Sequence, residues 1–281
     1  MTVDLSALPE AWVLLIVLGL AVGSFLNVCI YRMPHRLSLF RPGSRCPSCE
    51  AEIRWRHNVP ILSWLWLRGQ CVRCGTRISP RYPIVEALNT FMWVLVGLRF
   101  GLTLQTLLLL PFASAMIVLF FTDFDHKLLP NAVTLPLALL GLAVSPFNPR
   151  LDLGEGFLAG GSGLGRPIAA AVGAATGYGV LLALVLAWRV LFGREAMGGG
   201  DLKMMLGVGA FSGVHGVAIT IFAASLGGTL LSLPLLLFRR WSTTRELPFG
   251  CFLAPAALLA VTYGSDIVGW YLDLVLAGRS F

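Results

Sequence analysis

The chain has 281 residues, of which 57% are hydrophobic and only 12% are charged, and its mean hydropathy is +0.80. Soluble domains carry roughly 25% charged residues, so this composition excludes an ordinary globular protein whose whole surface faces water. The formal net charge of +7 is compatible with nucleic-acid binding or with a membrane protein whose basic residues lie on one side. The positions of the basic residues distinguish these two cases.

Long apolar segments predict an all-α polytopic membrane protein with about eight transmembrane helices. A helix needs about 20 predominantly apolar residues to cross a bilayer; four segments reach or approach that length, and four are shorter or less regular. In chain order the segments are 11–33, 84–98, 104–121, 131–147, 167–192, 203–212, 216–238 and 249–262. We predict that the first is a retained helix, because the acidic Asp4 and Glu10 precede it where a signal peptide carries basic residues.

The basic residues gather on one side of this predicted topology. With the N-terminus outside and eight spans, one side receives the segments 32–83, 122–130, 189–203 and 239–248. That side holds 17 of the 21 Lys and Arg residues, and the other side holds four. The positive-inside rule makes the basic side cytoplasmic. We therefore expect a multi-pass protein of the cytoplasmic (inner) membrane, whose partner is the lipid bilayer and which does not bind nucleic acid.

The segment 34–83 is a long stretch without a span, and it separates the first two predicted helices. It divides the chain into a first helix (1–33), a small cytoplasmic domain (34–83) and a membrane core (84–281). Its many Arg, Pro and Gly residues predict turns and short strands in place of a long helix. The glycine-rich segment 148–166 is predicted to be a flexible external connection.

Four cysteines in the cytoplasmic domain form two Cys-x-x-Cys pairs, Cys46/Cys49 and Cys71/Cys74, with 21 residues between the pairs. Two such pairs can supply four thiolates to a tetrahedral structural Zn²⁺ in a zinc-ribbon-like fold. Disulfides are disfavoured in the reducing cytoplasm, and redox chemistry would need only one pair. A domain of this size builds little core, so metal binding would supply much of its folding free energy.

Two segments place carboxylates at the cytoplasmic ends of predicted spans. Asp123 and Asp125 end one apolar run, and Asp201 follows three glycines, 198–200. Residues two apart on a helix point in nearly opposite directions, and Asp123 lies nearer the apolar run, so we favour Asp123 over Asp125. Consecutive glycines would allow the backbone of a substrate to approach closely.

Paired carboxylates at membrane depth admit three interpretations. Two that share a proton can act together, one activating water and the other protonating a scissile carbonyl, as in aspartic proteases. Intramembrane carboxylates also relay protons or ions in transporters. The third interpretation is that they are interfacial charges that help to end helices.

Several motifs, in order along nearly the whole chain, resemble those of the bacterial type IV prepilin peptidases. Residues 23–34 (GSFLNVCIYRMP) are similar to the signature that ends their first span. Residues 46–74 and then 81–86 (RYPIVE) resemble their cytoplasmic domain and its exit. Residues 198–201 fit the Gly-x-Gly-Asp motif of intramembrane aspartyl proteases, and Asp123, seven residues before a proline, matches the first catalytic aspartate.

This resemblance implies two reactions. In the first, the catalytic residues Asp123 and Asp201 cleave the basic leader of a prepilin or pseudopilin on the cytoplasmic face. In the second, the newly exposed amine is methylated with S-adenosylmethionine, and members without methylation tend to lack the long cytoplasmic domain that this chain has. The sequence has no Rossmann-type glycine fingerprint for this cofactor, so Arg81 and Glu86 are only candidate cofactor-binding residues.

Two functions from other classes remain as alternatives. A proton-coupled membrane transporter would use intramembrane aspartates, but it predicts carboxylates near the bilayer midplane and matching halves. A membrane-anchored zinc-ribbon docking module would explain the four cysteines but not the motif at 198–201.

Overall fold

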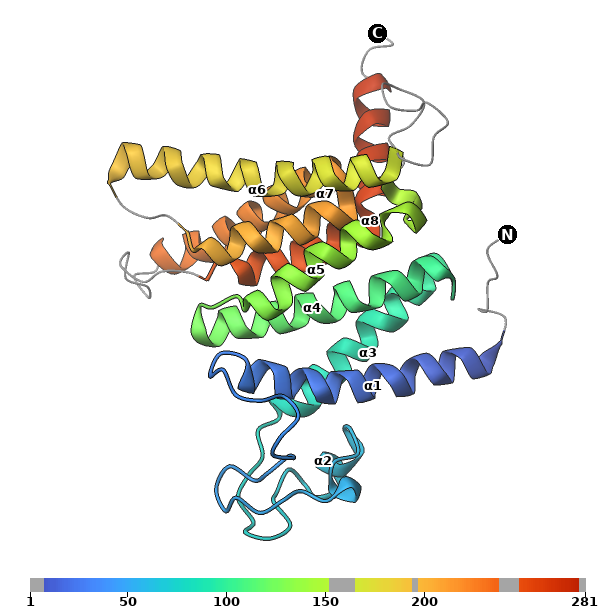
Figure 1. The fold of residues 1–281 in the computed structure, drawn as a ribbon, viewed down its shortest axis with the longest axis vertical. Coiled ribbons are helices and arrows are strands. Elements are labelled where there is room, and N and C mark those ends of the chain that lie inside the picture. The colour runs from blue at the N-terminus through green and yellow to red at the C-terminus, as the bar shows by residue number, and fades with distance from the viewer. Residues whose placement is uncertain (1–7, 152–164, 194–196, 238–247, 278–281) are drawn as a thin grey trace. The chain divides into compact units, whose positions relative to one another are not determined.

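The computed structural model describes residues 8–151, 165–193, 197–237 and 248–277. The helices, shown in Figure 1, are α1 Pro9–Arg32, α2 Leu62–Trp66, α3 Arg81–Phe100, α4 Leu104–His126, α5 Asn131–Val144, α6 Gly165–Phe192, α7 Gly199–Leu237 and α8 Gly250–Ala277. Three 3₁₀ turns accompany them, η1 Trp55–His57, η2 Ser145–Phe147 and η3 Pro149–Leu151. Most of the predicted external connection, 152–164, lies outside the described residues.

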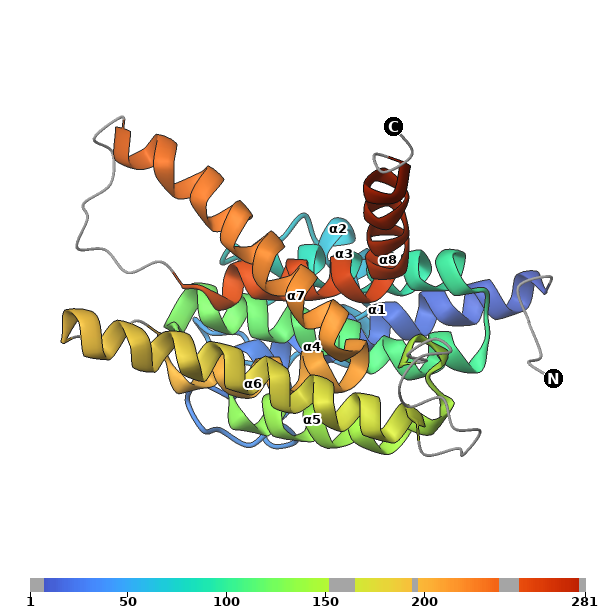
Figure 2. The ribbon, with the colours of Figure 1, turned by 90° about the horizontal axis from the view of Figure 1, so that it is seen from above.

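The all-helical membrane fold predicted from the sequence is confirmed. Six helices in the described part of the chain, namely α1, α3, α4, α6, α7 and α8, are long and apolar enough to cross a membrane. The other two predicted spans are helical as well. Segment 131–147 forms the shorter α5 and η2, and segment 203–212 is continuous with 216–238 in α7. Gly213 interrupts α7 with a non-helical backbone (φ 65°, ψ −168°), and Figure 2 shows the long course of this helix.

The chain divides into two compact units, Met1–Val118 and Leu119–Phe281. In the first unit α1 packs on α3 through glycines: a Cβ on Gly23 would lie 2.7 Å from the Cα of Glu86. The buried Asn89 of α3 donates from Nδ2 to the Gly19 carbonyl over 2.7 Å. Its Oδ1 accepts a hydrogen bond from Ser114 Oγ over 2.7 Å. Small residues allow close helix approach, and polar side chains then link the helices inside the membrane.

In the second unit α7 lies against α5, α6 and α8. Side chains such as Met204, Met205, Val208 and Phe211 of α7 are almost fully buried there. Gly209 of α7 meets the backbone of Gly173 of α6 so closely that neither position has room for a Cβ. This packing fixes the first turn of α7, which carries Asp201.

The segment 34–83, predicted to be a cytoplasmic domain, contains turns as expected but no regular strand among its described residues. Only two isolated bridges form, Arg45 with Glu52 and Gln70 with Arg77, so the prediction of short strands was wrong. Each bridge closes one Cys-x-x-Cys turn, and the segments that flank each turn do not continue the pairing into a regular strand. One short helix, α2, lies between the two turns.

Candidate functional site

Asp123 lies in the last turn of α4, with its side chain only 5% exposed. Asp125, two residues later on the same helix, is exposed. Helical geometry produces this difference, because residues two apart point about 200° from each other. Only Asp123 of this pair faces the interior of the second unit.

Asp201 lies in the first turn of α7 and is 7% exposed. The preceding glycines start this helix: Gly198 is not helical, and Gly199 begins α7. A Cβ on Gly200 would lie 2.9 Å from Leu129 Cβ, whereas a Cβ on Gly199 would meet nothing within 4 Å. Gly200 is therefore required for packing, and space remains open beside Gly199.

The fold brings Asp123 and Asp201 close enough to interact electrostatically. Oδ1 of Asp201 is buried and has no hydrogen-bond partner among the described residues. A buried carboxyl oxygen without a partner is costly in free energy. Such an atom is typical of a group that meets a proton, a water or a substrate atom during its function.

A third element, the N-terminus of α8, completes the surroundings of Asp123. The Cys251 N–H donates to Oδ2 of Asp123 over 3.0 Å, and the Gly250 backbone and the Cys251 thiol make further hydrogen-bonding contacts with this carboxyl group. The first N–H groups of a helix have no partner within it. Asp123 therefore caps α8 from another helix.

This contribution of residues 249–251 was not predicted from the sequence. Cys251 lies in an apolar run and its side chain is buried, as is usual for a core cysteine. The available signal was Gly250, which stands where an apolar run begins. Nothing in the sequence indicates that this helix start meets Asp123, 127 positions earlier.

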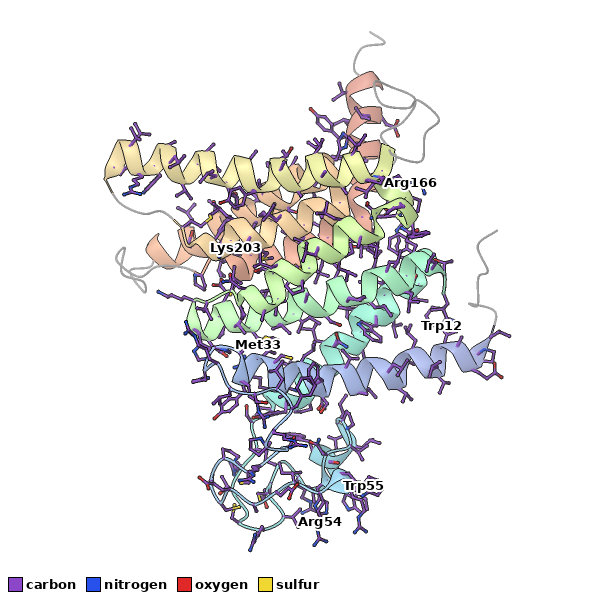
Figure 3. All side chains as sticks on the ribbon, viewed as in Figure 1. Trp12, Met33, Arg54, Trp55, Arg166 and Lys203 are labelled. Carbon is purple, nitrogen blue, oxygen red and sulfur yellow. The ribbon has the colours of Figure 1, made fainter. Side chains whose placement is uncertain are left out.

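Beside the aspartates, Lys203 of α7 connects two elements of the second unit. Its Nζ donates to Oδ1 of Asn131, the first residue of α5, over 2.9 Å. Lys203 is labelled in Figure 3, near the start of α7. This bond holds the helix start that bears Asp201 against the start of α5.

The four predicted metal ligands converge within segment 34–83. The Sγ atoms of Cys46, Cys49, Cys71 and Cys74 all lie within 4.8 Å of one another, and those of Cys46 and Cys74 are 3.7 Å apart. Tetrahedral zinc with Zn–S bonds of about 2.3 Å places its sulfurs roughly 3.8 Å apart. The thiol positions therefore fit one tetrahedral metal ion.

Two turns of the same design present these thiols. Cys46 N–H donates to the Ala51 carbonyl and Cys71 N–H to the Thr76 carbonyl, each five residues further on. The residue four positions after each first cysteine has a positive φ, 54° at Glu50 and 70° at Gly75. The second pair thus builds its tight turn on glycine, and the first pair builds the same turn on a non-glycine residue.

Hydrogen bonds within these turns favour the thiolate form at Cys46 and Cys74. At Cys49 the Ala51 backbone lowers the pKa, but burial and the neighbouring thiols outweigh it and raise the pKa of this thiol to about 11. The side chain and then the backbone of Thr76 lower the pKa of the Cys74 thiol to about 6. The backbone N–H groups of Cys49 and Ser48 lower the pKa of Cys46. The turns thus supply thiolate character at one cysteine of each pair.

The two candidate cofactor-binding residues lie at the start of α3. The side chain of Glu86 is buried, and its Oε2 accepts the Ile61 N–H over 2.7 Å. Arg81 is the first residue of the helix and is partly buried. The carboxylate of Glu86 therefore already holds the residue that precedes α2.

Two family models match the chain in succession. The bacterial peptidase A24 N-terminal domain matches residues 17–100, and the type IV leader peptidase family matches residues 110–233. The first match includes the four clustered cysteines, and the second includes both Asp123 and Asp201.

Curated relatives resemble the chain over nearly its full length. A prepilin leader peptidase/N-methyltransferase of Aeromonas salmonicida is 34% identical, with 94% of each chain covered. The protein of the same name from Neisseria gonorrhoeae is 36% identical, covering 96% of this chain and 98% of the relative, and that of Pseudomonas putida is 35% identical, covering 92% and 93%. These relatives do not favour the transporter alternative. No solved structure matches the chain significantly.

Proposed function

Because this chain belongs to the type IV leader peptidase family, we propose that it is a membrane-embedded aspartic endopeptidase with two activities. It removes the leader of a type IV prepilin or pseudopilin at the cytoplasmic membrane face, and it then N-methylates the new N-terminal residue. The observation that carries the peptidase activity is the pairing of two buried carboxyl groups, Asp123 and Asp201, within one compact unit.

The surroundings of the two aspartates support different roles for them. Asp123 accepts the Cys251 N–H at the N-terminus of α8, and the positive end of a helix dipole favours a negative charge. We assign Asp123 as the ionised base. Asp201 Oδ1 lacks a donor among the described residues, which favours the protonated form, and we assign Asp201 as the acid.

In the proposed reaction Asp123 takes a proton from water while the water oxygen attacks the scissile carbonyl carbon. Asp201 gives its proton to the carbonyl oxygen, so that a neutral diol forms. The carbon–nitrogen bond then breaks as Asp123 passes its proton to the leaving amine. A diol hydroxyl returns a proton to Asp201, which restores both carboxyl groups.

Asparagine substitutions at matched protein levels in membranes test this assignment. Asp123→Asn and Asp201→Asn each remove a group that must exchange protons, so we expect cleavage of a prepilin to fall by at least about 10²-fold. Asp125→Asn is the matched control, because this side chain is exposed, and its effect should be small. Near wild-type cleavage by Asp201→Asn would refute the assignment as an aspartic peptidase. If Asp125→Asn loses cleavage and Asp123→Asn retains it, only the choice between these two residues is wrong.

The methyl donor is proposed to be S-adenosylmethionine, with Arg81 and Glu86 as candidate residues for its site. Methylation needs no pair of carboxylates, so Asp201→Asn should still methylate a substrate whose leader is already removed. Purified protein is incubated with a prepilin, with and without S-adenosylmethionine, and the intact product mass is measured. A product that gains no methyl group when S-adenosylmethionine is present would refute the proposed methyltransferase activity.

We propose that the metal bound by Cys46, Cys49, Cys71 and Cys74 is a structural Zn²⁺. All four coordination positions would be filled by thiolates, so the ion would stabilise the cytoplasmic domain and leave no position for a substrate. The spacing of the thiols and their turns support this role.

For orientation, we propose a multi-pass protein of the inner membrane with its N-terminus outside. The distribution of basic residues supports it, since ten arginines lie between the last residue of α1 and the first residue of α3, both of which are counted (Arg32 and Arg81). Reporter fusions after Arg77 and Arg240 should report a cytoplasmic location, and a fusion near Gly160 an external one. Positions 160 and 240 lie outside the described residues. An external signal after Arg77 would reverse the orientation.

A further inference from the structure

The short helix α2 exposes three large apolar side chains on one face. Leu62 is 64% exposed, Leu65 59% and Trp66 86%; their spacing of three and four residues places them together on the helix surface. The opposite face is used for packing, since Ser63 is buried and Trp64 Nε1 donates to the Ile78 carbonyl over 3.1 Å. Trp55, in η1, is 79% exposed. We call Trp55, Leu62, Leu65 and Trp66 the α2 apolar face.

The charged side chains of the sequence around this face are all basic. From residue 53 to residue 85 the sequence contains six arginines and no aspartate or glutamate. Three of these arginines, Arg54, Arg56 and Arg68, adjoin the apolar face in the sequence and are exposed. Exposed tryptophan and leucine with arginine nearby are typical of a surface that lies in the headgroup region of a bilayer.

A hydrogen bond places the start of α2 beside the membrane helices. The Ile61 N–H, one residue before α2, donates to Glu86 Oε2 over 2.7 Å. Glu86 lies five residues inside α3, about 8 Å along the axis. The backbone of Glu86 also lies against Gly23 of α1. Gly23 is nine residues before the end of α1, which is about 14 Å along the helix axis. In Figures 1 and 2, α2 lies alongside α1 and α3 and not beyond their ends.

Both distances place the start of α2 beside turns that lie inside α1 and α3, two of the candidate membrane spans. Interfacial helices bury their apolar face roughly 5–10 Å into the boundary between headgroups and acyl chains. The exposed Tyr31 near the end of α1 and Tyr82 near the start of α3 are the aromatic residues expected at the same boundary. The exposed aromatic side chains of this region are therefore of the kind that a bilayer boundary accommodates.

We propose that the α2 apolar face is a lipid-binding surface that inserts into the cytoplasmic leaflet and prefers anionic headgroups. The apolar side chains enter the boundary region, and Arg54, Arg56 and Arg68 bind the phosphates of surrounding lipids. Anionic lipids attract basic residues close to the surface. This surface would hold the metal-binding domain against the membrane whether or not the chain is a peptidase.

Tryptophan fluorescence of the full-length protein in lipid bilayers tests this proposal. Bromine quenches tryptophan by contact, so one bilayer carries lipids brominated near the carbonyl end of the acyl chain and another carries lipids brominated near the methyl end. The emission of Trp66 is obtained as the difference between the wild type and Trp66→Phe. This emission should be quenched at least twofold more by the shallow bromines than by the deep ones. Trp64→Phe is the matched control from the opposite face of α2. The emission of Trp64, obtained in the same way, should change little with either brominated lipid. Metal content equal to wild type verifies that both variants are folded.

The lipid preference is measured by adding phosphatidylglycerol to a phosphatidylcholine bilayer. Shallow quenching of Trp66 should rise with the anionic fraction in the wild type and lose this dependence in the triple variant Arg54→Gln, Arg56→Gln, Arg68→Gln. Trp66 emission that neither brominated lipid quenches would overturn the proposal. If that unquenched emission shifts to the blue when a prepilin is added, the face binds protein and the lipid assignment is wrong. Equal quenching at every anionic fraction would overturn the headgroup preference.

Discussion

Gly250 and Asp123 approach so closely that no side chain fits between them. A Cβ on Gly250 would lie 2.7 Å from Asp123 Oδ2 and 2.9 Å from its Cγ. The start of α8 can therefore reach the carboxylate only because residue 250 is glycine, and the Cys251 N–H then meets Oδ2. The position of the proposed base depends on a helix start that is distant in sequence.

The first prediction concerns this contact. Gly250→Ala should displace the Asp123 carboxylate or the start of α8 and lower prepilin cleavage by about 10- to 100-fold, because a misplacement of about 1 Å can cost 10²-fold in rate. Cleavage is measured in membranes at matched protein levels. Gly269→Ala, in the same helix, is the control, since a Cβ there would meet nothing within 4 Å. Wild-type cleavage by Gly250→Ala would show that the contact does not position the carboxylate.

The second prediction concerns the cysteine cluster. Elemental analysis of the purified protein should find about one zinc per chain. Cys46→Ser or Cys74→Ser should lower the zinc content and unfold segment 34–83, because metal binding and folding of such small domains are coupled. Cys29→Ser, which changes a buried cysteine of α1, should retain the metal. Stoichiometric zinc in a variant that lacks all four clustered cysteines would contradict the assignment.

The third prediction concerns Asn89, whose side chain is fully buried and bonds to both Gly19 and Ser114. Asn89→Ala removes both hydrogen bonds, and we expect it to lower the free energy of unfolding by about 1–2 kcal/mol. Thermal unfolding in detergent measures this change. Thr229→Ala is the control, since its exposed hydroxyl bonds only within its own helix. An equal melting temperature for Asn89→Ala and wild type would mean that these bonds add no stability.

Local composition was sufficient to predict most of the helical fold. Apolar runs the length of a bilayer must form helices, because a lipid environment leaves backbone groups no other partner. The same reasoning counted segments 203–212 and 216–238 as separate spans, whereas they form the two parts of α7 on either side of Gly213. Hydropathy detects where a run weakens, but it does not distinguish a kink within one helix from a loop between two.

The sequence by itself determined the composition of the candidate sites: four cysteines in two pairs, and aspartates at the ends of apolar runs. Helical periodicity also separated the buried Asp123 from the exposed Asp125, because that difference is local to one turn. Only the tertiary structure decided what surrounds them. Asp123 meets Cys251 128 positions away, and Glu86 holds Ile61 25 positions away. Contacts of this kind depend on how glycine-lined helices pack, and the spacing of residues along the chain does not contain that information.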